Sequence, residues 1–151
     1  MDGDGQNDPA DISSMLHLLN TTDAAMVTGL RANRKDSWLR HRMSRIANAV
    51  RQKILHDGVT DSGCALKAFR KEVLRSLIPI RTLYSFIPAL AVAAGFRVIE
   101  VEVNHRPRKT GTSKYGLGVM LWRPVVDMIG IWWFIHRRFP ELEAISTHFP
   151  Q

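Results

Sequence analysis

The stretch Ala25-Met26-Val27-Thr28-Gly29 decides the fold class of this chain. It is a short apolar run closed by a glycine, which predicts a buried strand over residues 25–28. Apolar residues at helical spacing predict a helix over 9–20 before it and another, with a clear apolar stripe, from Trp38 to about 56. A strand between two helices indicates a mixed α/β fold.

The rest of the chain continues this mixture of elements. A final helical stretch is rich in Trp and Ile, and we expect Pro124 to kink or split it. A polar, basic loop is expected over 31–37 and a second one over 105–115. In chain order, the other predicted elements are a strand over 64–69, short helices over 71–77 and 86–94, a strand over 97–103 and the final helix over 117–138.

Composition and charge narrow the classes of partner. The 151 residues suit one domain, and 21 basic against 14 acidic residues give a formal net charge of +7. Such a surface favours nucleic acid, phosphorylated ligands or an acidic membrane face. The single cysteine, Cys64, excludes an internal disulfide and a thiolate zinc cluster, and we expect it to be a small buried residue. The apolar runs 86–96 and 128–135 are too short to span a membrane.

The acidic segment Asp2-Gly3-Asp4-Gly5-Gln6-Asn7-Asp8 is a candidate metal site. Asp2 and Asp4 can aim two carboxylates at one hard cation, and Gln6 can add a carbonyl oxygen. An EF-hand loop is excluded, because its sixth and twelfth positions would hold Asn7 and Ser13 rather than Gly and Glu. A solvated acidic turn before a helix remains the other interpretation, since acidic residues complement a helix N-terminus.

The second basic loop is dense in groups that bind phosphate. Within 104–115, Arg108, Ser113 and Lys114 offer a planar fork of donors, a hydroxyl and a point charge, and Gly111 allows close backbone approach. A loop that merely solvates a surface has a similar composition. Its position after a predicted buried strand, where ligand loops lie in α/β sheets, favours an anion site.

A second basic cluster precedes and enters the helix predicted from Trp38. Arg40 and Ser44 are four residues apart and share one helix face, while Arg31 lies before the helix. The cluster is either a solvated face or a site for an anion. Nucleic acid is not expected, because no nucleic-acid motif is present and the acidic N-terminal segment repels a phosphate backbone. Asp61, in a predicted turn, can present a carboxylate into a cleft.

Several of these segments, in this order, resemble family 2 glycosyltransferases of the polyprenyl-phosphate branch, of which dolichol-phosphate mannosyltransferase is the type. The similarity extends over nearly the whole chain to about residue 138. One DxD motif alone is a weak signal, whereas several motifs in order are a strong one. The matching stretches are Asp2-Gly3-Asp4-Gly5-Gln6-Asn7-Asp8-Pro9, Thr28-Gly29-Leu30-Arg31, Ser44-Arg45-Ile46-Ala47-Asn48, Asp61-Ser62-Gly63-Cys64-Ala65-Leu66-Lys67-Ala68-Phe69 and Arg108-Lys109-Thr110-Gly111-Thr112-Ser113-Lys114-Tyr115-Gly116.

The resemblance implies a GT-A fold, which is a Rossmann-like α/β domain for nucleotide-diphospho-sugars. It also implies transfer of a sugar from a nucleotide-sugar donor to a polyprenyl phosphate, such as dolichyl or undecaprenyl phosphate, at the cytoplasmic face of a membrane. The expected organisation is a domain over 1–138, with a membrane-interface helix near 117–138 and a tail over 139–151. Peripheral association with the membrane surface is expected.

The resemblance also implies the site residues. Asp2, Asp4 and Gln6 would hold Mg²⁺ or Mn²⁺ against the donor diphosphate, with Asp2 and Asp4 counted as catalytic. Arg108 and Lys114, also catalytic, and Ser113 would contact phosphates near the reacting centre. The substrate-binding residues on the acceptor side would be Arg31, Arg40 and Ser44, with Asp61 touching sugar or acceptor.

One departure from the family bears on function. The family carries a nucleotide-binding βαβ half before its DxD motif, whereas here the motif directly follows Met1. The expected domain is therefore the C-terminal portion of a GT-A fold, incomplete as an isolated enzyme, and a separate chain that supplies the N-terminal half is a candidate partner. The alternative function is a non-catalytic module that binds anionic lipid or a partner protein.

Overall fold

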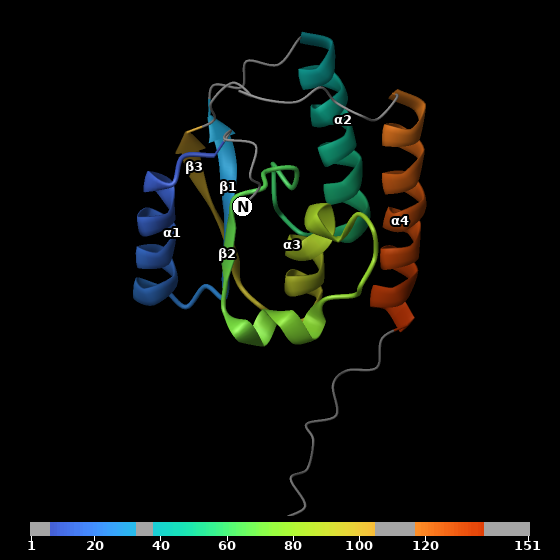
Figure 1. The fold of residues 1–151 in the computed structure, drawn as a ribbon. Helices are drawn as coiled ribbons and strands as arrows, with labels where there is room; N and C mark the ends of the chain where they lie inside the picture. The colour runs from blue at the N-terminus through green and yellow to red at the C-terminus, as the bar shows by residue number, and fades with distance from the viewer. Residues whose placement is uncertain (1–6, 33–37, 105–116, 138–151) are drawn as a thin grey trace, which may run out of the picture.

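A small open sheet organises the described part of the molecule. The computed structural model describes residues 7–32, 38–104 and 117–137, and Figure 1 shows their arrangement. The central strand is β1 (Met26–Ala32), which pairs in parallel with β3 (Val98–Asn104) and antiparallel with β2 (Lys67–Phe69). The strand order is thus β2-β1-β3. The predicted mixed α/β class is confirmed.

Helices cover both faces of this sheet. In Figure 1, α1 lies on one side of the strands, α3 lies against the other, and α2 and α4 stand beyond α3. The Asp8 carboxylate accepts a hydrogen bond from the backbone N–H of Ala10, 3.1 Å away, where α1 begins. The helical elements are α1 (Ala10–Thr21), α2 (Trp38–Leu55), a 3₁₀ helix η1 (Lys71–Ser76), α3 (Leu83–Ala93) and α4 (Leu117–Arg137).

The apolar core divides into clusters that follow these layers. Met15 and Leu19 of α1 pack on Val27 and Val103 at one face of the sheet. Met26 packs on the opposite side, with side chains from η1 and α3. A further cluster joins the helices away from the sheet; its buried members are Leu55, Phe86, Ala89, Leu90, Met128 and Ile131.

The central strand is longer than predicted. We expected Gly29 to close it and Arg31 to begin a loop, but β1 continues through both. A Cβ atom at Gly29 would lie 2.8 Å from Cys64 Sγ and 2.8 Å from Val103 Cγ2. Glycine is therefore required here by close packing inside a strand rather than by a turn. Arg31 consequently projects from the end of a rigid element.

Other boundaries differ from the expectations. The strand predicted over 64–69 is restricted to β2, because its register with β1 begins at Lys67, whereas the turn predicted over 61–63 is present just before it. The helix predicted over 86–94 begins three residues earlier, at Leu83. Pro124 lies inside α4 without dividing it. The short helix predicted over 71–77 is a 3₁₀ helix.

Two helices present apolar side chains to the outside. The apolar stripe of α2 predicted a buried face, yet Ile46 and Val50 are 62% and 44% exposed. On α4, Met128 and Ile131 pack inward, and Ile135 packs against the same cluster. Among the described side chains of α4, the exposed large apolar ones are Val125, Val126, Ile129, Trp132 and Trp133. No helix in the described ranges is long and apolar enough to cross a membrane.

The packing at Gly29 gives a test of the fold. We expect Gly29→Ala to lower the free energy of unfolding by about 1–3 kcal/mol, because the added methyl group overpacks the contact between Cys64 and Val103. Gly130→Ala is the matched control, since nothing lies within 4 Å of a Cβ atom there. In the interior of α4 the same change should stabilise by about 1 kcal/mol. Urea denaturation measures both, and equal shifts would contradict the tight packing at Gly29.

Candidate functional site

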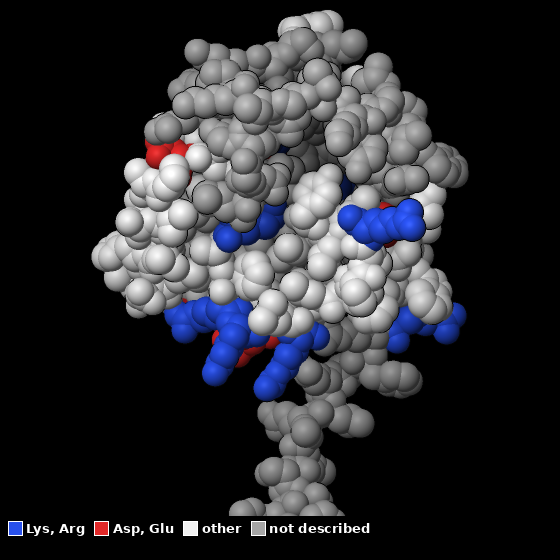
Figure 2. Space-filling model, viewed as in Figure 1, with Lys and Arg blue, Asp and Glu red and all other residues white. Residues whose placement is uncertain are grey.

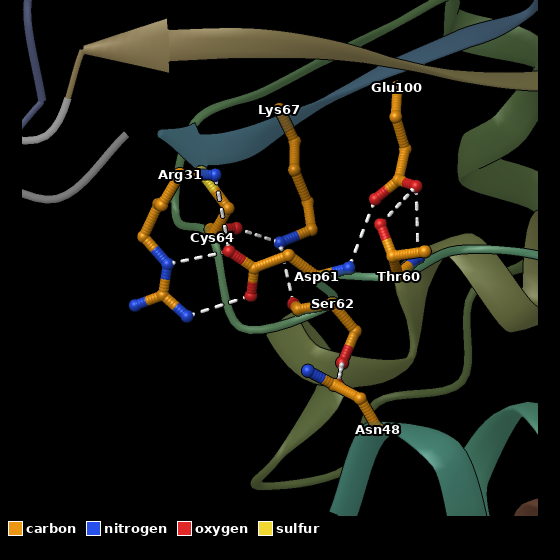
Figure 3. Close-up of polar contacts among 8 residues, drawn as sticks. All are labelled: Arg31, Asn48, Thr60, Asp61, Ser62, Cys64, Lys67 and Glu100. Atoms are coloured by element: carbon orange, nitrogen blue, oxygen red, sulfur yellow. Dashed lines mark hydrogen bonds and ion pairs between the residues drawn. The ribbon is translucent and has the colours of Figure 1, made fainter. Parts of the chain in front are cut away.

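Arg31 and Asp61 form the centre of the candidate site (Figure 3). Arg31 lies near the carboxyl end of β1, and Asp61 lies in the turn that follows α2. The Arg31 guanidinium donates from Nε to Asp61 Oδ2 and from Nη2 to Oδ1, each at 2.7 Å. The backbone N–H of Arg31 donates to the same carboxylate at 3.3 Å. This two-pronged geometry fixes the plane of the guanidinium as well as its position.

The turn that carries Asp61 is tied to the strand β3. The Glu100 carboxylate accepts hydrogen bonds from the backbone N–H of Thr60 at 2.9 Å and of Asp61 at 3.0 Å. It also accepts the Thr60 hydroxyl at 2.6 Å. One side chain therefore satisfies two consecutive backbone donors directly beside Asp61.

The other end of the turn is tied to β2 and α2. The Lys67 ammonium donates to the backbone carbonyl of Ser62 at 3.0 Å and to that of Cys64. The Ser62 hydroxyl lies 3.2 Å from Asn48 Oδ1 on α2, within hydrogen-bond distance. Figure 3 shows these contacts converging on the turn from separate elements.

Burial changes the electrostatics of this cluster. Burial lowers the pKa of Lys67 from its usual value near 10.5 to about 8, so the ammonium form prevails at neutral pH. Burial also raises the pKa of the Cys64 thiol, and Cys64 is fully buried. The expectation of a small buried cysteine is confirmed, because a nucleophilic thiol requires the opposite shift and access.

A second buried pair joins α2 to the loop that leads into the turn. Arg51 Nη1 of α2 lies 2.9 Å from Asp57 Oδ2, and both side chains are almost completely buried. Burial lowers the pKa of Arg51 and raises that of Asp57, in each case against the attraction of the partner. The Arg51 guanidinium and Gln52 also donate to the carbonyl of Val59. The chain is thereby fixed just before Thr60.

The structure brings together some of the predicted site residues. Arg31 and Asp61 are in direct contact, which the sequence did not predict. Ser44 lies on α2 and is partly buried, and Arg40 lies on the same helix with a side chain outside the described part. The other predicted site residues, Asp2, Asp4, Gln6, Arg108, Ser113 and Lys114, also lie outside the described residues.

The first turn of α1 and the ends of β1 and β3 nevertheless meet at one edge of the sheet. Ala32 and Asn104 are register partners at the carboxyl ends of β1 and β3. Asp11, in the first turn of α1, accepts hydrogen bonds from the backbone and side-chain N–H groups of Asn104 at 2.8 and 3.2 Å. Asn104 and the first turn of α1 therefore meet at the edge that carries Arg31.

Sequence reasoning missed Glu100 and Lys67. Each is a charged residue within a segment predicted to be a strand. A charge at such a position could have indicated a role for both residues. A lysine inside a buried strand needs partners for its ammonium, because unpaired burial of a charge is costly. Among the described residues, no group of three or more His, Cys, Asp or Glu side chains is arranged to hold a metal ion.

The chain is similar to curated sugar transferases. It is 36% identical over 117 residues to the undecaprenyl-phosphate 4-deoxy-4-formamido-L-arabinose transferase of Edwardsiella ictaluri, a match covering 78% of this chain and 36% of the relative. It is 36% identical over 138 residues to the dodecaprenyl-phosphate galacturonate synthase of Rhizobium johnstonii, covering 89% and 40%. A further arabinose transferase, from Aeromonas hydrophila, is 37% identical over 122 residues.

These matches cover most of this chain but a minor part of each relative. The chain spans between 36% and 40% of the length of these curated proteins. No family model matches it. The similarity nonetheless confirms the resemblance that the motifs indicated: this chain is homologous to part of the polyprenyl-phosphate sugar transferases.

Proposed function

We propose that this chain is part of a glycosyltransferase that moves a sugar from a nucleotide-sugar donor to a polyprenyl phosphate, built on part of a GT-A domain. The observation that carries the proposal is the edge of the sheet at which Arg31 and Asp61 meet. The names of the relatives of this chain contain a polyprenyl phosphate. A fixed guanidinium is suited to the phosphate of such a substrate.

The acceptor side of the proposed site comprises Arg31, Arg40, Ser44 and Asp61. A phosphate monoester is ionised at neutral pH, so the attacking oxygen needs no strong general base. Asp61 is paired with Arg31 through both of its oxygens. We therefore assign Asp61 the task of orienting the guanidinium and contacting the sugar or acceptor, rather than proton abstraction.

The donor side would use the acidic segment and the second basic loop. Asp2, Asp4 and Gln6 form an all-oxygen donor set, which suits Mg²⁺ or Mn²⁺. A bound cation of this kind would stabilise negative charge on the donor diphosphate. Arg108, Ser113 and Lys114 would donate hydrogen bonds to phosphate oxygens as the diphosphate leaves, which is electrostatic stabilisation of the developing charge.

The outward apolar face of α4 favours a second candidate function. The same residues would then serve a module that binds anionic lipid or a partner protein but does not catalyse. Transfer from radiolabelled UDP- or GDP-sugars to polyprenyl phosphate, with and without a supplied N-terminal half, distinguishes the two functions.

The outward apolar face of α4 supports peripheral binding to a membrane surface, and we propose that this surface is the cytoplasmic one. Ile129 and Trp133 are each 57% exposed, and Arg137 stacks over the Trp133 ring with 6.0 Å between the guanidinium carbon and the ring centroid. Tryptophan suits the lipid–water boundary, and basic side chains suit anionic headgroups. The inward residues of the same helix pack on the core, so the outer face is available for lipid.

The basic loop provides a test of phosphate binding. We expect Arg108→Ala or Lys114→Ala to weaken binding of undecaprenyl phosphate in detergent micelles by roughly tenfold, because each removes a charge-assisted hydrogen bond. Lys71→Ala is the charge-matched control and should bind like the unmodified chain. Lys71 lies on η1, at the lower end of the molecule where Figure 2 shows basic side chains gathered, away from the site edge. Equal losses in all three variants would show that overall charge alone attracts the lipid.

The tryptophans provide a test of membrane association. Flotation with vesicles should show binding that increases with anionic lipid and decreases with salt. The double change Trp132→Ser and Trp133→Ser should reduce the floated fraction severalfold, because buried tryptophan area is lost. Leu16→Ser is the control, since Leu16 is 48% exposed on α1 at the other face of the sheet. If the folded chain stays in solution with anionic vesicles at low salt, the membrane proposal is wrong.

A further inference from the structure

The turn over residues 60–64 is held by side chains from the two strands that flank β1. In the sheet register, Thr28 of β1 pairs with Lys67 of β2 and with Glu100 of β3. Because these residues are in register, Lys67 and Glu100 point to the same face of the sheet, on either side of the fully buried Thr28. Both side chains reach the same turn.

The two side chains hold opposite kinds of backbone group. Glu100 accepts from the N–H groups at the start of the turn, and Lys67 donates to carbonyl groups at its end. Between them lies Asp61, whose side chain is 6% exposed and whose two oxygens both bind Arg31. A shift of this turn by one ångström would break the two-pronged contact, since hydrogen-bond geometry has little tolerance.

We propose that Lys67 and Glu100 are positioning residues, which clamp the turn over 60–64 from two strands and thereby hold Asp61 against Arg31. This inference rests on the proposed function, because it assigns the clamp to the acceptor side of the site. In this proposal Lys67 and Glu100 do not touch the substrate, and they act on its binding only by fixing the turn. Their effect on ligand binding is exerted through the orientation of the Arg31 guanidinium.

Amide hydrogen exchange of the substrate-free chain tests the clamp directly at neutral pH. Glu100→Gln should accelerate exchange at Thr60 and Asp61 by roughly tenfold, because hydrogen bonds to a charged acceptor are the stronger ones. Glu102→Gln is the matched control, an exposed glutamate two residues along the same strand. Lys67→Met should accelerate exchange at Cys64, whose N–H donates to the carbonyl of Asp61, and Lys67→Arg should restore protection.

Binding of undecaprenyl phosphate in micelles then tests the link to function. Lys67→Met and Glu100→Gln should weaken binding severalfold, while their urea denaturation midpoints stay close to that of the unmodified chain. Unchanged exchange in both variants would overturn the clamp. Faster exchange with full binding, while Arg31→Ala loses binding, would also overturn the positioning role. If Arg31→Ala binds fully as well, the acceptor site of the proposed function fails, and with it the role of the clamp in that site.

The pH dependence of stability isolates Lys67 from the rest of the clamp. The pKa of Lys67 is about 8 in the folded chain and near 10.5 when unfolded, so the unfolded state binds more protons between these values. The free energy of unfolding contributed by Lys67 should therefore increase with pH across this window. Its charged neighbours are Asp61, Arg31 and Arg51, and the Cys64 thiol lies beside it.

The measurement is urea denaturation of Lys67→Met and the unmodified chain at pH 7 and pH 9.5. The stability of Lys67→Met relative to the unmodified chain should be highest at pH 7, where the buried ammonium is charged, and should decline by pH 9.5. A difference that is constant or grows over this interval would contradict the buried charge at position 67.

Discussion

The register of β1 between its two neighbours is the constraint on which the candidate site depends. Thr28 pairs with Lys67 and Glu100, and this pairing places a cation and an anion on opposite sides of one buried threonine. A slip of one residue in either strand would turn the side chain to the other face of the sheet. The turn that carries Asp61 would then lose one of its two attachments. The site therefore depends on the pairing of strands that are distant from one another in sequence.

Maintaining this arrangement requires buried charge, which costs free energy. Lys67 lies within the cluster, and the pair of Arg51 and Asp57 is almost completely buried beside it. A buried ion pair is frequently no more stabilising than a well-packed apolar pair of the same size. The advantage of these buried charges is directional. Arg51 and Lys67 both donate to backbone carbonyls, which apolar side chains could not bind. The buried charges thus fix the geometry of a loop at a cost in stability. Ionisable groups with perturbed pKa values of this kind concentrate at functional sites.

Much of the fold, but less of the site, could be predicted from the sequence. Periodicity located α1, α2 and β3 to within one or two residues, because each has a long apolar pattern. Gly29 was misinterpreted as a strand end, since its reason for being glycine is a contact with Cys64 and Val103 that only the folded chain brings about. The sequence showed the apolar stripe of α2 but not that it faces outward. Periodicity shows that a helix has an apolar face but not what covers that face.

The candidate site shows the same division. Arg31 and Asp61 were selected by their motifs, yet their contact joins residues thirty positions apart and required the structure. Lys67 and Glu100 act on backbone groups, and no motif of functional side chains records such a role. Residues that act through the main chain of a turn are found from register and hydrogen bonding, after the fold is known.

The proposed acceptor has two chemically different parts, and the described surface offers a place for each. The phosphate suits the fixed guanidinium of Arg31, and the polyprenyl chain suits an apolar surface. On α2, Asn48 faces the turn through Ser62, whereas Ile46 and Val50, two residues away on either side, are exposed. Residues two apart on a helix point in nearly opposite directions, so one helix borders the polar site and carries an apolar outer face. A lipid phosphate acceptor would use both surfaces, because its charged end must reach Arg31 while its chain stays out of water.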